Sequence, residues 1–352
     1  MQQKLHQWYN ENKRDLPWRK TTNPYIIWLS EIILQQTRVE QGLPYFNNFL
    51  NAYKSITEFA NADLNEVLKL WQGLGYYSRA RNMHATAVLI RDNYHGIFPQ
   101  TYAELIKLKG IGPYTAAAIA SFANNEPKAV VDGNVYRVLS RFAGVYTDIN
   151  STEGKKEFAI LANELLDTKN PATHNQAIME LGALICKPQN PNCLECPLNN
   201  ACYAFEHKVQ QQLPVKIKTV KIKQRYFNYA IINYKNSIFI KQRTEKDIWH
   251  GLFEFPMVEN NKLLNETDLI HEFGENNIFI DTKTTQIEWI GNDKHQLTHQ
   301  TLYANFYKIT CSKAPQLPAT FLKIKLDELQ NYAIPRLLDK LISNDKLQQS
   351  LF

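Results

Sequence analysis

The sequence of 352 residues has only five cysteines and four methionines, and it has no long uninterrupted apolar run. Its longest apolar stretch, from Tyr25 to Leu34, is interrupted by Ser30 and Glu31 and is too short to span a membrane. The first fifteen residues have no apolar core, so they do not resemble a secretory signal. These absences exclude secreted and membrane-spanning classes, and we expect an intracellular protein that does not bind a membrane.

Composition sets further bounds. Hydrophobic residues make up 44% of the chain, which excludes a largely disordered protein. Lys and Arg number 40 against 34 Asp and Glu, so the net charge of +6 permits a nucleic-acid partner without requiring one. A single core rarely extends beyond about 250–300 residues, and the length therefore predicts two domains.

The two parts of the chain have different patterns. Residues 1–206 have apolar positions at helical spacing, separated by Gly, Pro and Asn, which predicts a helical domain. Residues 226–352 contain segments rich in Ile, Phe, Tyr and Thr, followed by two short helical patterns, which predicts an α+β domain. Predicted helices lie at 25–36, 63–74, 101–108, 114–122, 134–142, 326–331 and 335–343, and predicted strands at 226–234, 237–241, 287–290 and 300–310.

Residues 207–225 are the predicted linker between these domains. They belong to a longer stretch, 207–244, that has nine Lys or Arg residues and no Asp or Glu. The part from Lys208 to Arg225 lacks strong periodicity, as linkers do. Charge alone does not distinguish a solvated linker from a segment that follows DNA phosphates, and both interpretations stay open.

Four of the five cysteines lie close together. Cys186, Cys193, Cys196 and Cys202 fall within 17 residues, whereas Cys311 is far downstream. Such a group in an intracellular protein favours metal ligation over disulfides. Four thiolates suit a tetrahedral zinc ion or a four-iron cluster, but the outer spacings of six and five residues differ from the two close pairs usual at zinc sites. A [4Fe–4S] cluster is therefore favoured, and Cys311 is interpreted as a small buried residue.

A Gly-x-Gly turn precedes a second motif. Gly110 and Gly112 follow an apolar helical segment, and Pro113 stands where the first turn of a helix accepts proline. Backbone N–H groups at such a helix start can face an anion, although the turn alone is also typical of ordinary helix pairs. Asp132, 20 residues after Gly112, precedes another helical segment. By itself it is a plain N-cap that typically contributes about 1 kcal/mol, but beside the turn it becomes a candidate for facing the bound ligand.

Glu31 stands among apolar residues in the predicted helix at 25–36. A carboxyl in this position is either exposed at a helix edge or held in a pocket where burial raises its pKa. A raised pKa is what a general acid needs at neutral pH, so Glu31 is a candidate catalytic residue.

Together these motifs resemble those of the helix-hairpin-helix–Gly/Pro–Asp superfamily of DNA base-excision glycosylases, and the cysteine spacing resembles its iron–sulfur branch. Three further stretches resemble MutY-type adenine DNA glycosylases, which remove adenine mispaired with 8-oxoguanine. They are DLPWR at 15–19, WLSEIILQQT at 28–37 and GLGYYSRAR at 73–81. The resemblance covers residues 15–202 almost continuously and implies an all-α helix-hairpin-helix DNA glycosylase domain at 1–206, with its iron–sulfur loop at 186–202.

The C-terminal part resembles the Nudix-like domain of the same family. Residues Gly251 to Pro256 are similar to its GLxEFP signature. A working Nudix hydrolase has a further Glu-rich box that binds Mg²⁺, and no such run follows Pro256. The resemblance therefore implies a lesion-recognition domain at 226–352 without hydrolase activity. In the family a Phe-Ser-His turn probes the oxidised guanine, and the nearest match is Leu297-Thr298-His299, which keeps the hydroxyl and loses the aromatic ring.

The resemblance also assigns roles in removing a flipped adenine. Glu31 is the expected acid at N7 of the base, and such an acid typically contributes about 10²–10⁴-fold. Asp132 is expected to stabilise the oxocarbenium-like sugar, staying ionised while Glu31 stays protonated. The matching base-pocket residues, whose ordinary alternatives are core packing and surface charge, are Arg14, Trp18, Arg19, Leu34, Val39 and Glu180.

Other positions match residues that contact DNA. Gln36 and Tyr76 correspond to side chains that the family inserts into the duplex, whereas Tyr77 is interpreted as packing. The expected DNA contacts are Gln36, Thr37, Tyr76, Gly110, Gly112, Thr298 and His299, with Arg79, Arg81, Lys109 and Lys128 as candidate phosphate contacts. The implied partner is double-stranded DNA with A:8-oxoguanine or A:G mispairs, bound by a monomer in a bacterial cytoplasm at the nucleoid.

Tyr114 separates two enzyme classes. Endonuclease III-like relatives place a Lys at this position, whose amine forms a Schiff base and cleaves the strand. A phenol does not do this, so the sequence predicts a monofunctional glycosylase, a hydrolase of N-glycosyl bonds with little or no lyase activity. Two alternatives stay open: an endonuclease III-like glycosylase/lyase, and a non-enzymatic DNA-binding module whose cluster senses redox state.

Overall fold

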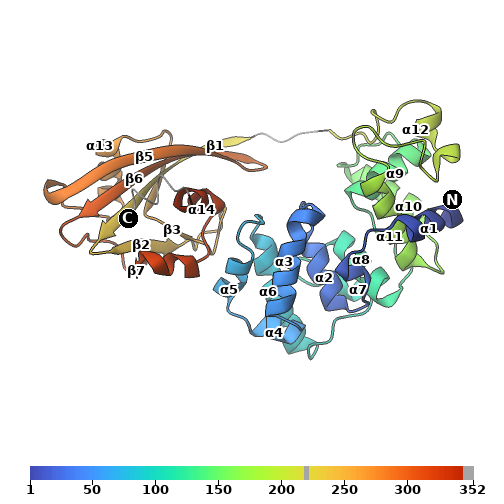
Figure 1. The fold of residues 1–352 in the computed structure, drawn as a ribbon, viewed down its shortest axis with the longest axis horizontal. Coiled ribbons are helices and arrows are strands. Elements are labelled where there is room, and N and C mark those ends of the chain that lie inside the picture. The colour runs from blue at the N-terminus through green and yellow to red at the C-terminus, as the bar shows by residue number, and fades with distance from the viewer. Residues whose placement is uncertain (218–221, 344–352) are drawn as a thin grey trace. The chain divides into compact units, whose positions relative to one another are not determined.

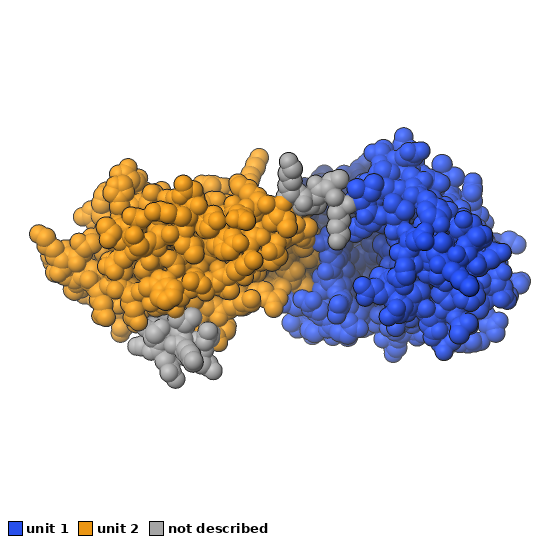
Figure 2. Space-filling view, turned by 90° about the horizontal axis from the view of Figure 1, so that it is seen from above, with its two compact units in different colours: residues 1–61, 82–218 blue, residues 62–81, 219–352 orange. Residues whose placement is uncertain are grey.

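The computed structural model describes residues 1–217 and 222–343 (Figure 1). The chain forms two compact units, one of residues 1–61 and 82–218 and the other of residues 62–81 and 219–352 (Figure 2). The predicted linker at 207–225 therefore lies partly outside the described residues, at 218–221, and so does the end of the predicted second domain, at 344–352.

The regular elements described in the first unit are all helical. The α-helices are α1 (Gln2–Asn12), α2 (Pro24–Ile33), α3 (Val39–Ala52), α4 (Ile56–Asn61), α6 (Ser78–Asn93), α7 (Tyr102–Leu105), α8 (Pro113–Asn124), α9 (Gly133–Ala143), α10 (Thr152–Leu165), α11 (Pro171–Leu184) and α12 (Tyr203–Glu206). Two 3₁₀ helices, η1 (Pro17–Arg19) and η2 (Asn199–Ala201), complete the set. Helix α6 begins in the second unit and ends in the first.

Local sequence explains where these helices begin. The side chain of Asn23 accepts a hydrogen bond from the backbone N–H of Tyr25, and Pro24 occupies the first turn of α2. Asp132 accepts from the N–H of Val135 at the start of α9. Gly112 is the N-cap of α8, and the chain reaches it through Gly110, whose φ of +76° is in the left-handed region.

Two helix pairs position the residues considered below. Helices α9 and α11 pack against each other, with α1 on the other side of α11, around a core that includes Leu5, Leu139, Phe158, Ile178 and Leu181. These five side chains are 3% exposed or less, and burial of each contributes about 1.5–3 kcal/mol. Helix α2 packs on α8, which brings the apolar segment around Glu31 against the helix that begins with the Gly-x-Gly turn.

The second unit contains a seven-stranded mixed sheet. Its strands are β1 (Lys223–Tyr234), β2 (Ser237–Gln242), β3 (Phe253–Glu254), β4 (Met257–Asn260), β5 (Thr285–Gln296), β6 (Gln300–Cys311) and β7 (Phe321–Lys325). The order is β3-β2-β1-β6-β5, with β4 also on β1 and β7 also on β2. The pair β1–β6 is parallel and the other pairs are antiparallel. The helices of this unit are α5 (Leu64–Leu70), α13 (Glu266–Glu275), α14 (Arg336–Ile342), η3 (Thr282–Thr284) and η4 (Leu326–Asn331).

Helix α13 covers part of one face of this sheet. Its Leu269 and Phe273 are fully buried in a core that also contains Ile232, Tyr307 and Ile309 from β1 and β6. An all-α part followed by an α+β part agrees with the fold class predicted from the sequence. Among the described residues, no helix combines the length and apolar composition that crossing a bilayer requires.

Candidate active site

Three predicted catalytic residues meet where α2, α8 and α9 come together. Glu31 lies on α2 and is 8% exposed, although it carries a carboxyl. Tyr114, in the first turn of α8, donates a hydrogen bond from its hydroxyl to Oε2 of Glu31. Asp132, the N-cap of α9, is close enough for its charge to act on both of these groups. The structure thus brings together residues that are up to 101 positions apart in the chain.

The surroundings of Glu31 favour its protonated form. Burial raises the pKa of this carboxyl from its ordinary value of 4.5 to about 7. The hydrogen bond from Tyr114 and the charge of Arg19 act in the opposite direction, and the charge of Asp132 adds to the increase. At neutral pH Glu31 can therefore both hold and release a proton, as a general acid must.

The environment of Asp132 has opposing effects on the charge of its carboxyl. Its carboxylate accepts hydrogen bonds from the backbone N–H of Val135 and from Nδ2 of Asn134, each at 2.7 Å. Burial raises the pKa of Asp132, while these bonds and the charge of Arg137 favour its ionised form. Asp132 is therefore both the N-cap of α9 and a neighbour of Glu31. The two interpretations offered by the sequence, a helix cap and a residue that faces the ligand, do not exclude each other.

Arg14, Arg19 and Glu180 form a buried ion cluster. The guanidinium of Arg14 donates to both oxygens of Glu180 at 2.9 and 2.8 Å, and that of Arg19 does so at 2.9 and 2.6 Å. Glu180 is 1% exposed, so burial alone would raise its pKa, but the two arginines lower it to about 2. Glu180 is therefore ionised at neutral pH and holds the guanidinium groups of Arg14 and Arg19 in place.

The other predicted base-pocket residues are placed differently. Trp18 packs edge-on against Phe46, with ring centroids 5.1 Å apart, which is a core contact. Leu34 and Val39 are half-buried at the end of α2 and the start of α3.

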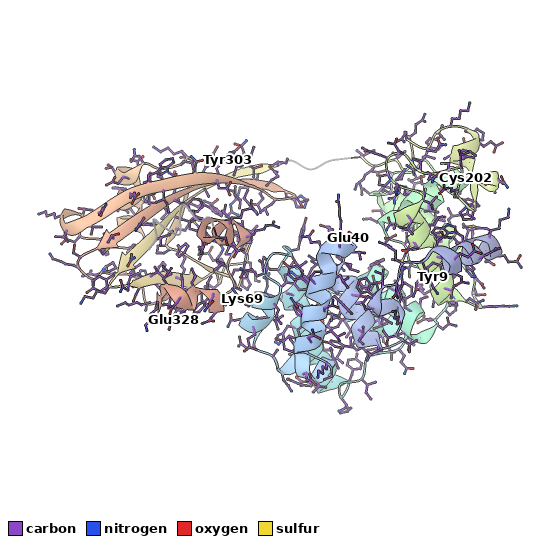
Figure 3. All side chains as sticks on the ribbon, viewed as in Figure 1. Tyr9, Glu40, Lys69, Cys202, Tyr303 and Glu328 are labelled. Atoms are coloured by element: carbon purple, nitrogen blue, oxygen red, sulfur yellow. The ribbon has the colours of Figure 1, made fainter. Side chains whose placement is uncertain are left out.

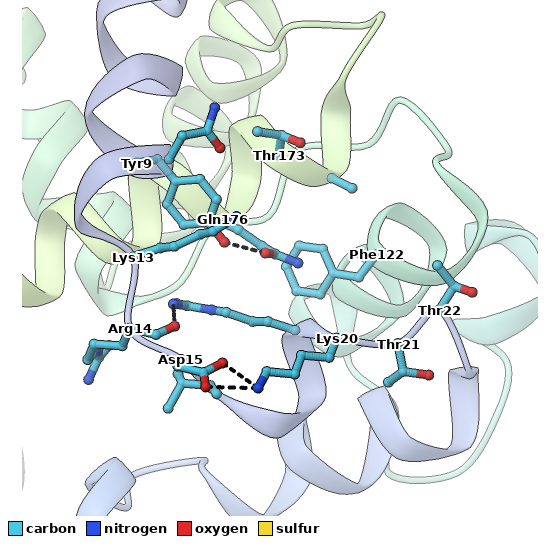
Figure 4. A pocket seen from close by; sticks show the side chains of 14 residues that line it. Tyr9, Lys13, Arg14, Asp15, Lys20, Thr21, Thr22, Phe122, Thr173 and Gln176 are labelled. Carbon is cyan, nitrogen blue, oxygen red and sulfur yellow. Dashed lines mark hydrogen bonds and ion pairs between the residues drawn. The ribbon is translucent and has the colours of Figure 1, made fainter.

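Arg14 and Arg19 also line a cavity of about 800 Å³ (Figure 4). Tyr9 of α1 closes one side of it and donates a hydrogen bond to Oε1 of Gln176 on α11. The guanidinium of Arg19 lies 5.7 Å from the centroid of the Tyr9 ring. Neither Glu31 nor Asp132 lines this cavity.

Two of the predicted DNA-inserting residues have unusual backbone conformations. The φ angles of Gln36 and Tyr76 are +56° and +47°, in the left-handed region that side chains other than glycine rarely adopt. Both side chains are exposed, Tyr76 to 47%, and Thr37 beside Gln36 is half-buried. Residues such as His95 and Lys208 also have positive φ angles, so this conformation supports a functional role for Gln36 and Tyr76 only together with the family resemblance.

The arginines after Tyr76 are engaged within the second unit. The guanidinium of Arg79 lies 5.0 Å from the Trp71 ring and 5.7 Å from the Tyr76 ring. Arg81 donates to the carbonyl of His250 at 2.5 Å. Both side chains are thus used in packing, which differs from the open phosphate contacts that the sequence suggested.

The predicted lesion-reading turn connects β5 to β6. Leu297 N–H donates to the carbonyl of Gln300 at 2.8 Å, which closes the turn and leaves Thr298 and His299 exposed at its tip. The hydroxyls of Thr298 and Tyr76 are hydrogen-bonded to each other. A cavity of about 360 Å³ in the second unit is lined by residues 74–78, Arg81, 247–249 and 296–300.

The four clustered cysteines line one small cavity, of about 30 Å³, beside α9 and α12 (Cys202 is labelled in Figure 3). None of the four is in a disulfide among the described residues, and burial raises the pKa of Cys193, Cys196 and Cys202. Within the described residues, no three His, Cys, Asp or Glu side chains are placed to hold a single metal ion. The thiols around this cavity are the residues that could hold a larger cofactor.

Two arginines that the sequence analysis did not select support this cysteine loop. Arg137 Nε donates to the carbonyl of Cys186 at 2.6 Å. Arg141 donates to the Cys186 sulfur at 3.4 Å and to the carbonyls of Lys187 and Pro188 at 2.7 and 3.0 Å. Both are less than 10% exposed. Two arginines four residues apart on an amphipathic helix are a signal that sequence analysis could have used, since they share one face.

Comparison with known proteins shows the family of both parts of the chain. The family described as "HhH-GPD superfamily base excision DNA repair protein" matches residues 29–164, and the NUDIX domain family matches residues 228–344. An adenine DNA glycosylase of Buchnera aphidicola subsp. Baizongia pistaciae is 38% identical over 310 residues, which cover 86% of this chain and 84% of that protein. The human adenine DNA glycosylase is 41% identical over 218 residues, covering 59% of this chain and 40% of that protein.

Solved structures resemble the helical part. A thermostable thymine-DNA glycosylase superposes with a TM-score of 0.54 at 28% identity, covering 58% of this chain and 94% of that one. An endonuclease III–DNA complex superposes with a TM-score of 0.51 at 22% identity, which shows a shared fold. The resemblance inferred from the sequence motifs is confirmed, and the chain belongs to the family of MutY-type adenine DNA glycosylases.

Proposed function

We propose that this protein excises adenine mispaired with 8-oxoguanine or guanine from double-stranded DNA, by hydrolysis of the N-glycosidic bond and without strand cleavage. It acts as a monomer on the DNA of a bacterial nucleoid. The observation that carries the proposal is the buried Glu31, hydrogen-bonded by Tyr114 and adjacent to Asp132. This is a positioned acid beside a second carboxylate, which the reaction requires.

The proton of Glu31 enables adenine to leave. Its transfer to N7 of a flipped adenine makes the base a neutral leaving group when the bond between C1′ and N9 breaks. The bond electrons go to the base, and the sugar is left as an oxocarbenium-like cation that the charge of Asp132 stabilises. Water then adds at C1′ and loses a proton, which leaves an abasic site.

The Tyr114 hydroxyl supports the acid as it reacts. Its hydrogen bond favours the ionised form of Glu31, so it stabilises the carboxylate that appears once the proton has moved. Burial raises the pKa of Tyr114 well above its ordinary value of 10, and this phenol therefore remains a neutral donor. A phenol at this position cannot form a Schiff base with the sugar, which argues against a lyase step through this residue.

A gel assay tests this function against both alternatives. Duplexes with adenine opposite 8-oxoguanine, or with thymine glycol, are incubated with the protein and then analysed with and without hot alkali. We expect nicking only at adenine and only after alkali. Nicking without alkali at thymine glycol would favour the glycosylase/lyase, and no cleavage of either duplex would favour the non-enzymatic module.

A [4Fe–4S] cluster is the cofactor that we propose for the cysteine loop. Four thiols line one cavity, which fits a group held by four cysteines, and Arg141 beside Cys186 offsets the negative charge of the thiolates. Cys186, Cys193, Cys196 and Cys202 would hold it, and its chemistry there would be to fix the loop. We expect anaerobically purified protein to contain about four irons and no zinc. Zinc in colourless protein would contradict the cluster.

The turn at 297–299 is proposed to read 8-oxoguanine. This base has an N7–H donor where guanine has an acceptor, and the Thr298 hydroxyl can accept from it while donating elsewhere. The double variant Thr298→Val with His299→Ala should weaken binding to A:8-oxoguanine roughly five- to 150-fold and leave A:G nearly unchanged. Dissociation constants at one salt concentration, with a non-cleavable adenosine analogue, measure this. Equal losses for both mispairs would mean that the turn contacts DNA without reading the lesion.

A further inference from the structure

The three long strands β1, β6 and β5 extend beyond the part of the sheet that is covered. At the covered part, Asn228 and Asn305 are at most 5% exposed and are hydrogen-bonded to the backbone of Leu264, just before α13. Tyr226 and Tyr303 lie on the same face, two positions along their strands from Asn228 and Asn305 and closer to the β5–β6 turn. Both are only half-buried. One end of this sheet face is therefore open (Tyr303 is labelled in Figure 3).

The open end presents a row of side chains across three strands. Tyr226 on β1 pairs in register with Tyr303 on β6, which pairs with Lys294 on β5. The two tyrosine rings are stacked, with centroids 5.2 Å apart and planes inclined by 17°. Nζ of the exposed Lys294 lies 5.6 Å from the Tyr303 centroid. The row therefore combines an ammonium group with two phenol hydroxyls, of which that of Tyr226 donates to Oε1 of the exposed Gln224 at 3.2 Å.

No carboxylate lies among the strand residues at the open end of this face. Its members are Gln224, Tyr226, Asn228, Asn260, Asn292, Lys294, Gln296, Thr301, Tyr303 and Asn305. Asp293, next to Lys294, pairs in register with Ala304 and so belongs to the opposite face. Glu272 of α13 reaches this face at Asn260, whose side-chain amide donates a hydrogen bond to it at 3.1 Å. Lys294 forms no ion pair with any carboxylate of the described residues, and its charge remains available to a partner.

We propose that the row of Lys294, Tyr303 and Tyr226 binds the phosphate backbone of duplex DNA next to the lesion. This inference rests on the proposed reading of 8-oxoguanine by the turn at 297–299. The row continues directly from that turn, because β5 ends at Gln296, β6 begins at Gln300, and Lys223 N–H donates to the carbonyl of His299 at 3.0 Å.

The distance of the row from the turn and the chemistry of its side chains favour the DNA phosphate backbone as its partner. Four residues of extended strand separate His299 from Tyr303, which is roughly 13 Å, or about four nucleotides at 3.4 Å of axial rise. Phosphates at that distance from the lesion would meet an ammonium, two hydroxyls and amide groups, all of which are common phosphate contacts. A protein partner would also fit an exposed sheet face, but its binding would not depend on DNA length or on salt in the same way.

The test compares Lys294→Ala with Lys323→Ala. Lys323 on β7 is a matched control, because its Nζ also lies above a tyrosine ring, 5.0 Å from the centroid of Tyr234 at the other end of β1. Dissociation constants are measured for the full chain at several salt concentrations, on duplexes with a non-cleavable adenosine analogue opposite 8-oxoguanine or guanine. We expect Lys294→Ala to reduce the slope of log K against log salt by about 0.9 for both duplexes, and Lys323→Ala to leave it unchanged.

A second variant keeps the stacking. Tyr226→Phe with Tyr303→Phe removes both hydroxyls, and it should weaken binding to both duplexes without changing the salt slope. Duplexes that end within about three base pairs of the lesion should not distinguish Lys294→Ala from the wild type. If Lys294→Ala behaves as Lys323→Ala does, the proposed surface is wrong. The Thr298→Val with His299→Ala variant would still report lesion reading separately, because that variant affects only A:8-oxoguanine.

Discussion

Glu31→Gln should reduce the single-turnover rate of adenine removal by at least about 10²–10⁴-fold while leaving DNA binding nearly unchanged. The amide has the shape of the carboxyl and can accept the hydrogen bond from Tyr114, but it has no proton to give to the base. Quenched single-turnover kinetics measure the rate, and a non-cleavable analogue measures binding.

The pH dependence of the wild type supplies an independent check. Since the pKa of Glu31 is about 7 in the folded protein, the protonated fraction, and with it the rate, should fall about tenfold per pH unit above that value. Glu153→Gln, an exposed change in the first turn of α10, is the matched control and should keep the wild-type profile. Near-normal excision by Glu31→Gln would remove Glu31 from the role of acid.

Glu180→Gln should lower the free energy of unfolding of the first unit by about 3 kcal/mol at pH 7. The change removes the carboxylate that lies between Arg14 and Arg19. Arg19 is only 14% exposed, so its positive charge is then left without a counter-charge in a mostly buried position. The pKa of Glu180 is lowered to about 2 from 4.5, so its contribution to stability is present above about pH 4.5 and is lost as pH falls toward 2. Wild type and variant should therefore converge near pH 2.

Amide hydrogen exchange in α11 measures this difference without assuming that both units unfold together. Asp15→Asn is the control, since its ion pair with Lys20 is exposed and should contribute little (Figure 4). Equal protection of α11 in Glu180→Gln and the wild type at pH 7 would show that the arginines are satisfied without the carboxylate.

Much of this fold could be predicted because its signals are local. Asp132 as an N-cap and Pro113 in a first turn predicted the starts of α9 and α8 to within a residue. Helix ends were less predictable. The helix predicted at 63–74 ends at Leu70, and positive φ angles at Gly73 and Gly75 turn the chain soon after it. The helix predicted at 101–108 ends at Leu105, and the next N–H groups, of Lys107 and Leu108, donate to carbonyls only three residues back.

Features that depend on distant partners were not predicted. The parallel pairing of β1 with β6 joins residues about 77 positions apart, and no local pattern encodes it. Strand β5 was predicted only at 287–290, since its other residues are polar and form a half-exposed edge. Arg14, Arg19 and Glu180 were assigned to the base pocket from family resemblance alone, and their ion cluster was not predicted, because surface and buried charges look the same in a sequence.

The raised pKa of Glu31 has a consequence for how this gene can change. Above pH 7 the folded protein holds a buried carboxylate that is more stable in water, which reduces folding stability by up to about 3 kcal/mol. Replacement of Glu31 by a neutral residue would therefore increase the free energy of unfolding. Where a lineage no longer needs repair, stability should favour the replacement of Glu31 by a neutral residue, and the inactive descendants should melt at a higher temperature than their active ancestor.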